Sequence, residues 1–253
     1  MTAGRVPIGI LGGTFDPVHV GHVAVARAAR QALGLDGVWL VPTRQPPHRP
    51  RPPYTSIYHR FAMTALAALS TDGLRISDLE LDTPGPSYTA LLLERLHAEG
   101  YEAWQIVFII GADAFAEIAT WHQYPAILDR CHFAVISRPG QDADEAPASS
   151  ATHGLGVTGW AARLPHLATR FVQVAAASRG RDARSLVASR QPSIFLIDVA
   201  TPDVSSTEIR ERLRAGLPIA DMVPATVADY IQRHALYAGD VSTAGHLHEH
   251  TSQ

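Results

Sequence analysis

Hydrophobic positions along the chain follow two alternating patterns. Short runs of almost uninterrupted apolar residues are separated by longer stretches in which apolar residues recur with a helical period. Uninterrupted runs are typical of strands buried on both faces of a parallel sheet, and the helical period is typical of amphipathic helices that cover such a sheet. The runs predict strands over residues 6–11, 37–42, 104–110, 132–137 and 193–199.

The helical pattern is clearest directly after the first predicted strand. Over residues 22–34, small and branched apolar residues occupy one side and arginines the other, and Gly34 ends the pattern. Similar patterns predict helices over residues 56–69, 88–99, 206–215 and 225–234. Strands that alternate with helices predict an α/β fold with a doubly wound parallel sheet.

Two stretches have neither pattern. Residues 138–159 are rich in Gly, Ala, Ser and Asp, which predicts a flexible loop or insertion, with one or two helices to follow before Arg190. The tail over residues 238–253 is polar and is predicted to be disordered. The expected organisation is a single domain over residues 1–237 with a flexible insertion at about 140–190.

Composition narrows the class of protein. The 253 residues suffice for one sizeable α/β domain, and 21 basic against 24 acidic residues give no sign of a surface for nucleic acid or acidic membranes. Lysine is absent, so cationic contacts must come from Arg, His or a helix terminus. The single cysteine, Cys131, is expected to be buried and inert. No signal peptide or membrane-spanning run is recognisable, and a cytoplasmic enzyme is expected.

The first segment with candidate functional residues is GGTFDPVHVGH, residues 12–22. His19 and His22 follow a glycine turn at the start of a helix, where backbone N–H groups and the helix dipole favour anions, so the two rings can donate to a polyphosphate. The spacing of Gly9, Gly12 and Gly13 does not fit a dinucleotide fingerprint, and a P-loop requires a lysine. A two-histidine metal site and a purely structural cap remain alternatives.

The same segment resembles the T/H-x-G-H signature of the nucleotidyltransferase superfamily. Further segments, in order, resemble one branch, the bacterial nicotinate-nucleotide adenylyltransferases: VPTRQPPHRP (residues 41–50), PSYTALLL (86–93), FIIGADAFAEIATWHQY (108–124), SRPG (137–140) and VSSTEIRERLRAG (204–216). The resemblance covers residues 8–237. It implies a Rossmann-like fold of the nucleotidyltransferase type. It also implies adenylyl transfer from ATP, accompanied by Mg²⁺, to nicotinate mononucleotide in NAD biosynthesis.

Roles for individual residues follow from the resemblance. His19, His22 and Arg210 would be catalytic, positioning and neutralising phosphates without a general base. Residues expected to bind ATP are Gly12, Gly13, Thr14, Phe15, His19, His22, Gly111, Asp113, Arg138, Ser205, Ser206, Thr207 and Arg210. Residues expected to bind nicotinate mononucleotide are Asp16, His48, Arg49, Thr89, Ala90, Trp121 and His122. No residue is assigned to a metal held by the protein itself.

Some of these residues have a plainer interpretation when taken alone. S-S-T-x-x-R is most often an ordinary capped helix, Asp113 is a helix N-cap, and Trp121 is a core residue. The resemblance instead implies that the Trp121 ring stacks on the pyridine, and that backbone N–H groups near Thr89, Ala90 and His122 bind its carboxylate. Val204, Arg49 and His122 depart slightly from the usual motifs.

Several alternatives differ in substrate or class. An adenylyltransferase acting on nicotinamide mononucleotide or on another phosphate, such as phosphopantetheine, is the nearest. A nucleotide-binding regulator without turnover is disfavoured by the intact histidines and Arg210, and a tRNA-linked synthetase by the lack of an anticodon-binding module. ATP and nicotinate mononucleotide are the expected partners, with no nucleic acid and no membrane. The protein is expected to be a monomer or a homodimer.

Overall fold

The computed structural model describes residues 6–47, 51–137, 155–174 and 181–238. At its centre lies a seven-stranded sheet in the order β3-β2-β1-β4-β5-β7-β6, in which every pairing is parallel. The strands are β1 (Ile8–Gly13), β2 (Val38–Pro42), β3 (Leu74–Ile76), β4 (Ile106–Gly111), β5 (His132–Ser137), β6 (Phe171–Gln173) and β7 (Ile194–Asp198). The winding runs outward from β1 on one side and from β4 on the other, which confirms the predicted doubly wound α/β sheet.

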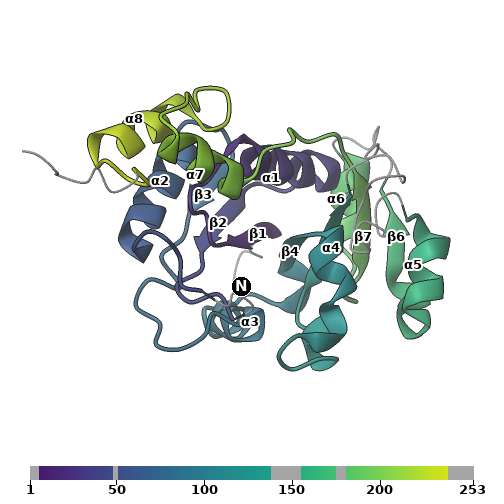
Figure 1. Cartoon of the computed structure of the whole chain (residues 1–253). Coiled ribbons are helices and arrows are strands. Elements are labelled where there is room, and N and C mark those ends of the chain that lie inside the picture. Colours follow the sequence, from purple (N-terminus) through teal and green to yellow (C-terminus); the bar gives the residue numbers. More distant parts are fainter. Residues whose placement is uncertain (1–5, 48–50, 138–154, 175–180, 239–253) are drawn as a thin grey trace, which may run out of the picture.

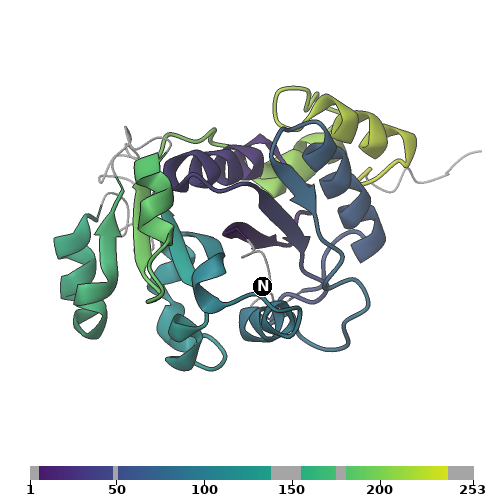
Figure 2. The same ribbon diagram turned by 180° about the vertical axis from the view of Figure 1, so that it is seen from behind.

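Helices cover both faces of the sheet (Figures 1 and 2). One face carries α1 (Val20–Leu33), α2 (Ile57–Leu69), α6 (Arg181–Val187), α7 (Ser206–Arg214) and α8 (Ala225–Arg233). The other carries α3 (Thr89–Ala98), α4 (Ala112–Ala116) and α5 (Val157–Arg163). Short 3-10 turns lie at Ala103–Gln105, Ile118–Thr120, Ala126–Asp129 and Pro165–Arg170.

Alternate residues of each central strand point into opposite layers of the core. In β4, Phe108 and Ile110 pack toward α3 and α4, whereas Val107 and Ile109 pack toward α1 and α2. Both faces of the sheet are covered, so both sets of side chains must be apolar. This explains the uninterrupted apolar runs in the sequence.

The predicted helix ends agree with local capping chemistry. Gly34, the C-cap of α1, has φ 61°, a left-handed conformation that glycine adopts without steric cost. At the start of α2, the Ser56 hydroxyl accepts a hydrogen bond from the His59 backbone N–H at 3.3 Å. The first and second predicted helices therefore end and begin where the sequence signals place them.

Two short strands, β3 and β6, were not predicted. Each has three residues and occupies one edge of the sheet, β6 within the expected insertion, beside the helices α5 and α6. A strand of this length has too few positions for a recognisable alternation, so pairing with its neighbour defines it. The predicted loop over residues 138–159 is wrong at its end, because α5 begins at Val157 and its first three residues fall within it. Residues 138–154 of that loop, and the predicted tail from residue 239 onward, lie outside the described residues.

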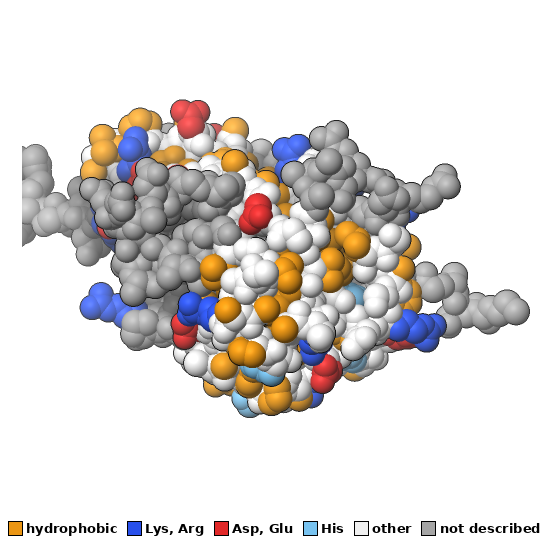
Figure 3. Space-filling model, turned by 90° about the vertical axis from the view of Figure 1, so that its right-hand side faces the viewer, with side chains coloured by type: hydrophobic (Ala, Val, Ile, Leu, Met, Phe, Trp, Pro, Cys, Tyr) orange, Lys and Arg blue, Asp and Glu red, His pale blue; other side chains and the backbone are white. Residues whose placement is uncertain are grey.

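The end of the molecule that carries α5 and β6 has a mixed surface (Figure 3). Arginine and acidic side chains are scattered among apolar and polar ones on the described part of this face, some of them next to one another. Within the part of the chain that the structure describes, none of the helices combines the length and apolar character needed to cross a bilayer. Cys131 is fully buried, and burial raises the pKa of its thiol, which fits the expected inert residue.

Candidate active site

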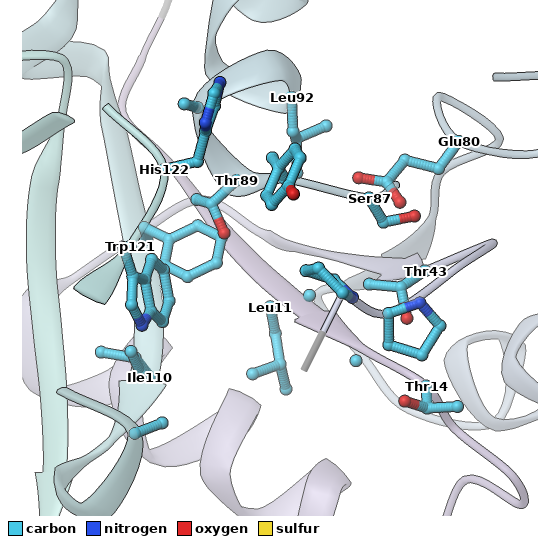
Figure 4. A pocket seen from close by; sticks show the side chains of 18 of the residues that line it. Leu11, Thr14, Thr43, Glu80, Ser87, Thr89, Leu92, Ile110, Trp121 and His122 are labelled. Atoms are coloured by element: carbon cyan, nitrogen blue, oxygen red, sulfur yellow. The ribbon is translucent and has the colours of Figure 1, made fainter. Parts of the chain in front are cut away.

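A pocket of about 370 Å³ opens at the carboxyl ends of β1, β2 and β4 (Figure 4). It lies where the direction of winding reverses, between β1 and β4, the usual ligand position in open parallel sheets. The N-terminus of α3 and the segment after α4 complete its walls. Many of the residues predicted to bind substrates line it: Gly12, Gly13, Thr14, Thr89, Ala90, Gly111, Trp121 and His122.

Aromatic rings form one end of the pocket. Trp121 is half-buried and meets the Phe108 ring edge-to-face at a centroid distance of 6.1 Å. His122 stacks on Tyr88, with centroids 4.5 Å apart and an interplanar angle of 24°. Trp121 and Thr14 lie at opposite ends of the pocket (Figure 4). A flat ligand group therefore fits at the Trp121 end.

Glu80 also lines the pocket and was not predicted. It is buried, and its Oε2 has no hydrogen-bond partner among the described residues. Burial raises the pKa of this carboxyl, an effect opposed by the Ser87 hydroxyl, the Arg44 backbone N–H and the charge of Arg95. The sequence around Glu80 has the composition of a solvated turn, so burial is visible only in the folded structure.

The two motif histidines lie together at the start of α1. His19 is the N-cap residue, and its ring centroid is 3.7 Å from that of His22. The backbone N–H of His19 donates to Nδ1 of His22 at 3.2 Å, so the neutral His22 ring carries its proton on Nε2. Phe15 packs edge-on against His22 at a centroid distance of 4.9 Å, and its ring occupies the space that a Cβ on Gly13, a residue that lines the pocket, would need. Neither histidine is among the lining residues; the pair follows Gly12, Gly13 and Thr14, which line the pocket.

Asp16 has a different surrounding from the one expected of a substrate ligand. Its Oδ2 accepts from the backbone N–H of Tyr54 at 2.6 Å. Its Oδ1 accepts from the hydroxyls of Thr55 and Tyr237, both at 2.7 Å. Burial is the main cause that raises the pKa of Tyr237, and the nearby Asp16 carboxylate is the second. The Tyr237 hydroxyl therefore keeps its proton and donates it in the hydrogen bond. The carboxylate thus holds three segments together, and its predicted contact with the mononucleotide stays a prediction.

The start of α7 contacts the segment between β1 and α1, residues 14–19, which we call the histidine loop. Ser205 is the N-cap residue and accepts from the Glu208 backbone N–H at 3.1 Å, while the Ser206 hydroxyl donates to the Pro17 carbonyl at 2.9 Å. Arg210 is buried and donates through Nη1 to the Asp16 carbonyl at 2.7 Å. The structure thus brings Arg210 to the same loop as the two histidines, although the sequence separates them widely.

Arg60 is a second buried arginine, which sequence reasoning missed. Its Nη1 donates to the carbonyls of Thr14 and Thr43, both at 2.7 Å, and its Nη2 and Nε donate to those of Arg44 and Thr55. These carbonyls belong to the segments that follow β1 and β2 and precede α2. An arginine within an amphipathic helix gives no sequence signal that its head is buried.

Other predicted residues lie outside this arrangement. Asp113 is exposed in the first turn of α4, whose N-cap is Gly111, so Asp113 is not the N-cap that its sequence alone predicts. His48, Arg49 and Arg138 fall outside the described residues. Across the described ranges, no group of three or more His, Cys, Asp or Glu side chains is placed to hold a metal ion.

Comparisons with known proteins show the family to which the chain belongs. A family model described as "Cytidylyltransferase-like" matches residues 10–212. Relatives named "Probable nicotinate-nucleotide adenylyltransferase" include those of Roseiflexus sp. (strain RS-1), 36% identical over 231 residues, and Geotalea daltonii, 38% identical over 231 residues. Each alignment covers 91% of this chain, and 98% and 97% of the relatives, respectively. The chain belongs to the nicotinate-nucleotide adenylyltransferase family. The family membership that the sequence motifs predict is confirmed.

Solved structures of the same fold include the nicotinic acid mononucleotide adenylyltransferase of Plasmodium falciparum. Its complex with NaAD gives a TM-score of 0.59 at 19% identity, and its complex with APC gives 0.57, also at 19%. Both alignments cover 92% of this chain and 98% of the other. The likeness confirms the nucleotidyltransferase type of the doubly wound sheet.

Proposed function

We propose that this member of the nicotinate-nucleotide adenylyltransferase family transfers the adenylyl group of ATP to nicotinate mononucleotide in NAD biosynthesis. An oxygen of the mononucleotide phosphate attacks the α-phosphorus, the bond from that phosphorus to the bridging oxygen breaks, and pyrophosphate leaves. Two observations support the proposal: the pocket has an aromatic end, and Gly13 and Thr14, which line it, lead directly into the loop at which His19, His22 and Arg210 meet.

Charge neutralisation supplies the catalysis in this proposal. A phosphate monoester is already a nucleophile at neutral pH, so positioning and electrostatic stabilisation suffice. His22 has its proton on Nε2, because Nδ1 accepts from the chain, and Nε2 donates to a phosphate oxygen. The Arg210 guanidinium and the start of α1 add donors where charge moves toward pyrophosphate.

The aromatic end is proposed to hold the pyridine ring. Trp121 stacks on the pyridine ring. Backbone N–H groups near Thr89 and Ala90, at the start of α3, donate hydrogen bonds to the carboxylate of the pyridine. A site that presents N–H donors matches a carboxylate better than an amide, whose NH₂ would face those donors. This supports nicotinate as the preferred base.

Magnesium is proposed to enter as part of the substrate. In the described part of the chain, no cluster of metal-ligating side chains is placed for a resident ion, and the Asp16 carboxylate already accepts three hydrogen bonds. Mg²⁺ commonly binds phosphate oxygens and keeps several waters. When bound, it neutralises phosphate charge, while the side chains of this protein orient the triphosphate.

A parallel assay tests the substrate. Pyrophosphate release from ATP is measured with nicotinate mononucleotide, nicotinamide mononucleotide and phosphopantetheine, and kcat/KM is expected to be highest for the first. Equal values for the two mononucleotides, or a preference for nicotinamide, would contradict the assignment of the aromatic end. Turnover restricted to phosphopantetheine would replace the proposed function.

Replacing the stacking ring tests the pocket itself. Trp121→Ala is expected to raise KM for nicotinate mononucleotide by about tenfold or more, because one stacked base is worth about 1–3 kcal/mol. KM for ATP should change little. Trp104→Ala is the control, since Trp104 lies just before β4, at the opposite end of the sheet. An unchanged KM in Trp121→Ala would remove Trp121 from the site.

A further inference from the structure

Arg210 is held in place by an aromatic ring as well as by hydrogen bonds. Its Cζ lies 4.4 Å from the centroid of the Tyr54 ring, and Arg214, one turn further along α7, lies 5.1 Å from the same centroid. Tyr54 is 60% exposed, whereas Arg210 is 5% exposed. The ring therefore forms the outer cover of the arginine.

The backbone that carries the Tyr54 ring is held by the histidine loop. The backbone N–H of Tyr54 donates to the Asp16 carboxylate, and the Asp16 carbonyl accepts from Arg210. Asp16 thus binds both the arginine and the backbone that carries the ring. Tyr54 contributes only its main-chain N–H to this bond with the Asp16 side chain, so replacing the Tyr54 side chain leaves the bond in place.

Arg210 has N–H donors that the described residues do not take up. A guanidinium has five N–H groups. The described residues take one through the Asp16 carbonyl and one through the Thr207 hydroxyl at 3.1 Å, and Nε is buried without an acceptor among them. A ring against one face of the guanidinium restrains its plane and takes up none of these donors.

We infer that Tyr54 is a positioning residue: its ring holds the Arg210 guanidinium in the orientation that meets the polyphosphate. The expected effect on kcat rests on the proposed function. The position of the Arg210 guanidinium against the ring rests on the contact geometry alone. Arg210 stabilises charge that develops as pyrophosphate leaves, so a loosened guanidinium lowers kcat more than it raises KM for the mononucleotide.

Substitutions at residue 54 separate the ring from its hydroxyl. Tyr54→Phe keeps the ring and is expected to retain kcat within about twofold. Tyr54→Leu removes the aromatic face and is expected to lower kcat by about 5- to 30-fold, the range of a cation–π contact with a desolvated arginine. Phenylalanines of increasing fluorination at residue 54 should lower kcat progressively. Tyr58→Leu, which removes a comparably exposed tyrosine from the first turn of α2, is the control and should leave kcat unchanged.

A spectroscopic readout tests the geometry without turnover. The Arg210 Nε–H resonance, assigned by its absence in Arg210→Lys, should be shifted upfield by the ring in the wild type and in Tyr54→Phe, and the shift should vanish in Tyr54→Leu. A shift that persists in Tyr54→Leu overturns the inference, as does wild-type kcat in that variant or an equal loss in Tyr54→Phe. A wild type that shows the shift but does not turn over nicotinate mononucleotide contradicts the proposed function alone.

Discussion

Histidine occurs both in the candidate active site and in the core, and its surroundings decide which chemistry it can perform. His19 and His22 lie at the start of α1, after the segment 12–14 that lines the pocket. His132, the first residue of β5, is fully buried, and its Nδ1 accepts the backbone N–H of Ser193 at 2.9 Å. Burial lowers the pKa of His132 to about 4, so the folded protein holds this ring neutral.

The buried histidine gives stability a defined pH dependence. The unfolded chain takes up the His132 proton near pH 6.5, and the folded state resists it to about pH 4. Falling pH between these values therefore favours unfolding, by up to about 3 kcal/mol. In urea unfolding at pH 7.0 and 4.5, the wild type should lose more stability than His132→Asn, whose amide oxygen still accepts from Ser193. Equal losses would contradict the neutral buried ring.

The motif histidines should matter for turnover and little for folding. His19→Ala or His22→Ala is expected to lower kcat by about two orders of magnitude or more, because each removes a donor used most in the transition state. Circular dichroism should show an intact fold. His97→Ala, on α3 and bonded to the Tyr101 carbonyl, is the control. A folded His22→Ala variant with near wild-type kcat would contradict the catalytic assignment.

At the scale of elements, Arg60 connects three segments that surround the site. From α2 it binds carbonyls that follow β1 and β2 and one that precedes its own helix. Thr14 and Thr43 also line the pocket, so the same contacts shape the substrate cavity. Parallel strands leave such segments side by side, and a planar group with several donors suits carbonyls that converge from different directions.

Removing this connection should be costly. Arg60→Met is expected to destabilise the protein by at least about 3 kcal/mol, because buried carbonyls lose their donors. KM for the mononucleotide should rise as the pocket wall loosens. Arg60→Lys should recover only part of the stability. A lysine ammonium is a compact charge and lacks the planar fork with which the guanidinium binds several carbonyls. Arg75→Met, an exposed position on β3, should change neither quantity. Urea unfolding that shows equal stability for Arg60→Met and Arg75→Met would contradict this role.

At the scale of the whole molecule, the end of the described chain closes onto its beginning. Tyr237, which follows α8, donates to the carboxylate of Asp16 in the loop after β1. A second tyrosine, Tyr230 on α8, bonds through its hydroxyl to His59 on α2 at 3.0 Å. The two hydroxyls thus attach the same terminal region to α2 and to the histidine loop.

These two tyrosines allow a matched comparison. Tyr237→Phe and Tyr230→Phe should each reduce the free energy of unfolding by about 1–2 kcal/mol, since each loses a hydrogen bond. Tyr237→Phe alone should also lower kcat/KM, by about fivefold, because Asp16 loses a donor that fixes the histidine loop. Chemical denaturation and steady-state kinetics measure both effects. Equal kcat/KM in the two variants would show that the chain closure does not affect the site.

The sequence by itself determined the alternation of strands and helices, the helix ends at Gly34 and Ser56, and the membership of the family. These are local properties. Strands buried on both faces must be apolar throughout, and a cap depends on residues a few positions apart. The motif at residues 12–22 was visible for the same reason, because its histidines are one helical turn apart.

Tertiary structure alone decided what surrounds those residues. The burial of Glu80 and Arg60, the three donors on Asp16 and the ring of Tyr54 over Arg210 all join segments far apart in the chain. The edge strands β3 and β6 likewise exist through pairing with neighbours. Contacts of this kind depend on which strand ends meet at the point where the direction of winding reverses. The spacing of two residues along the chain does not give the distance between them in the folded structure.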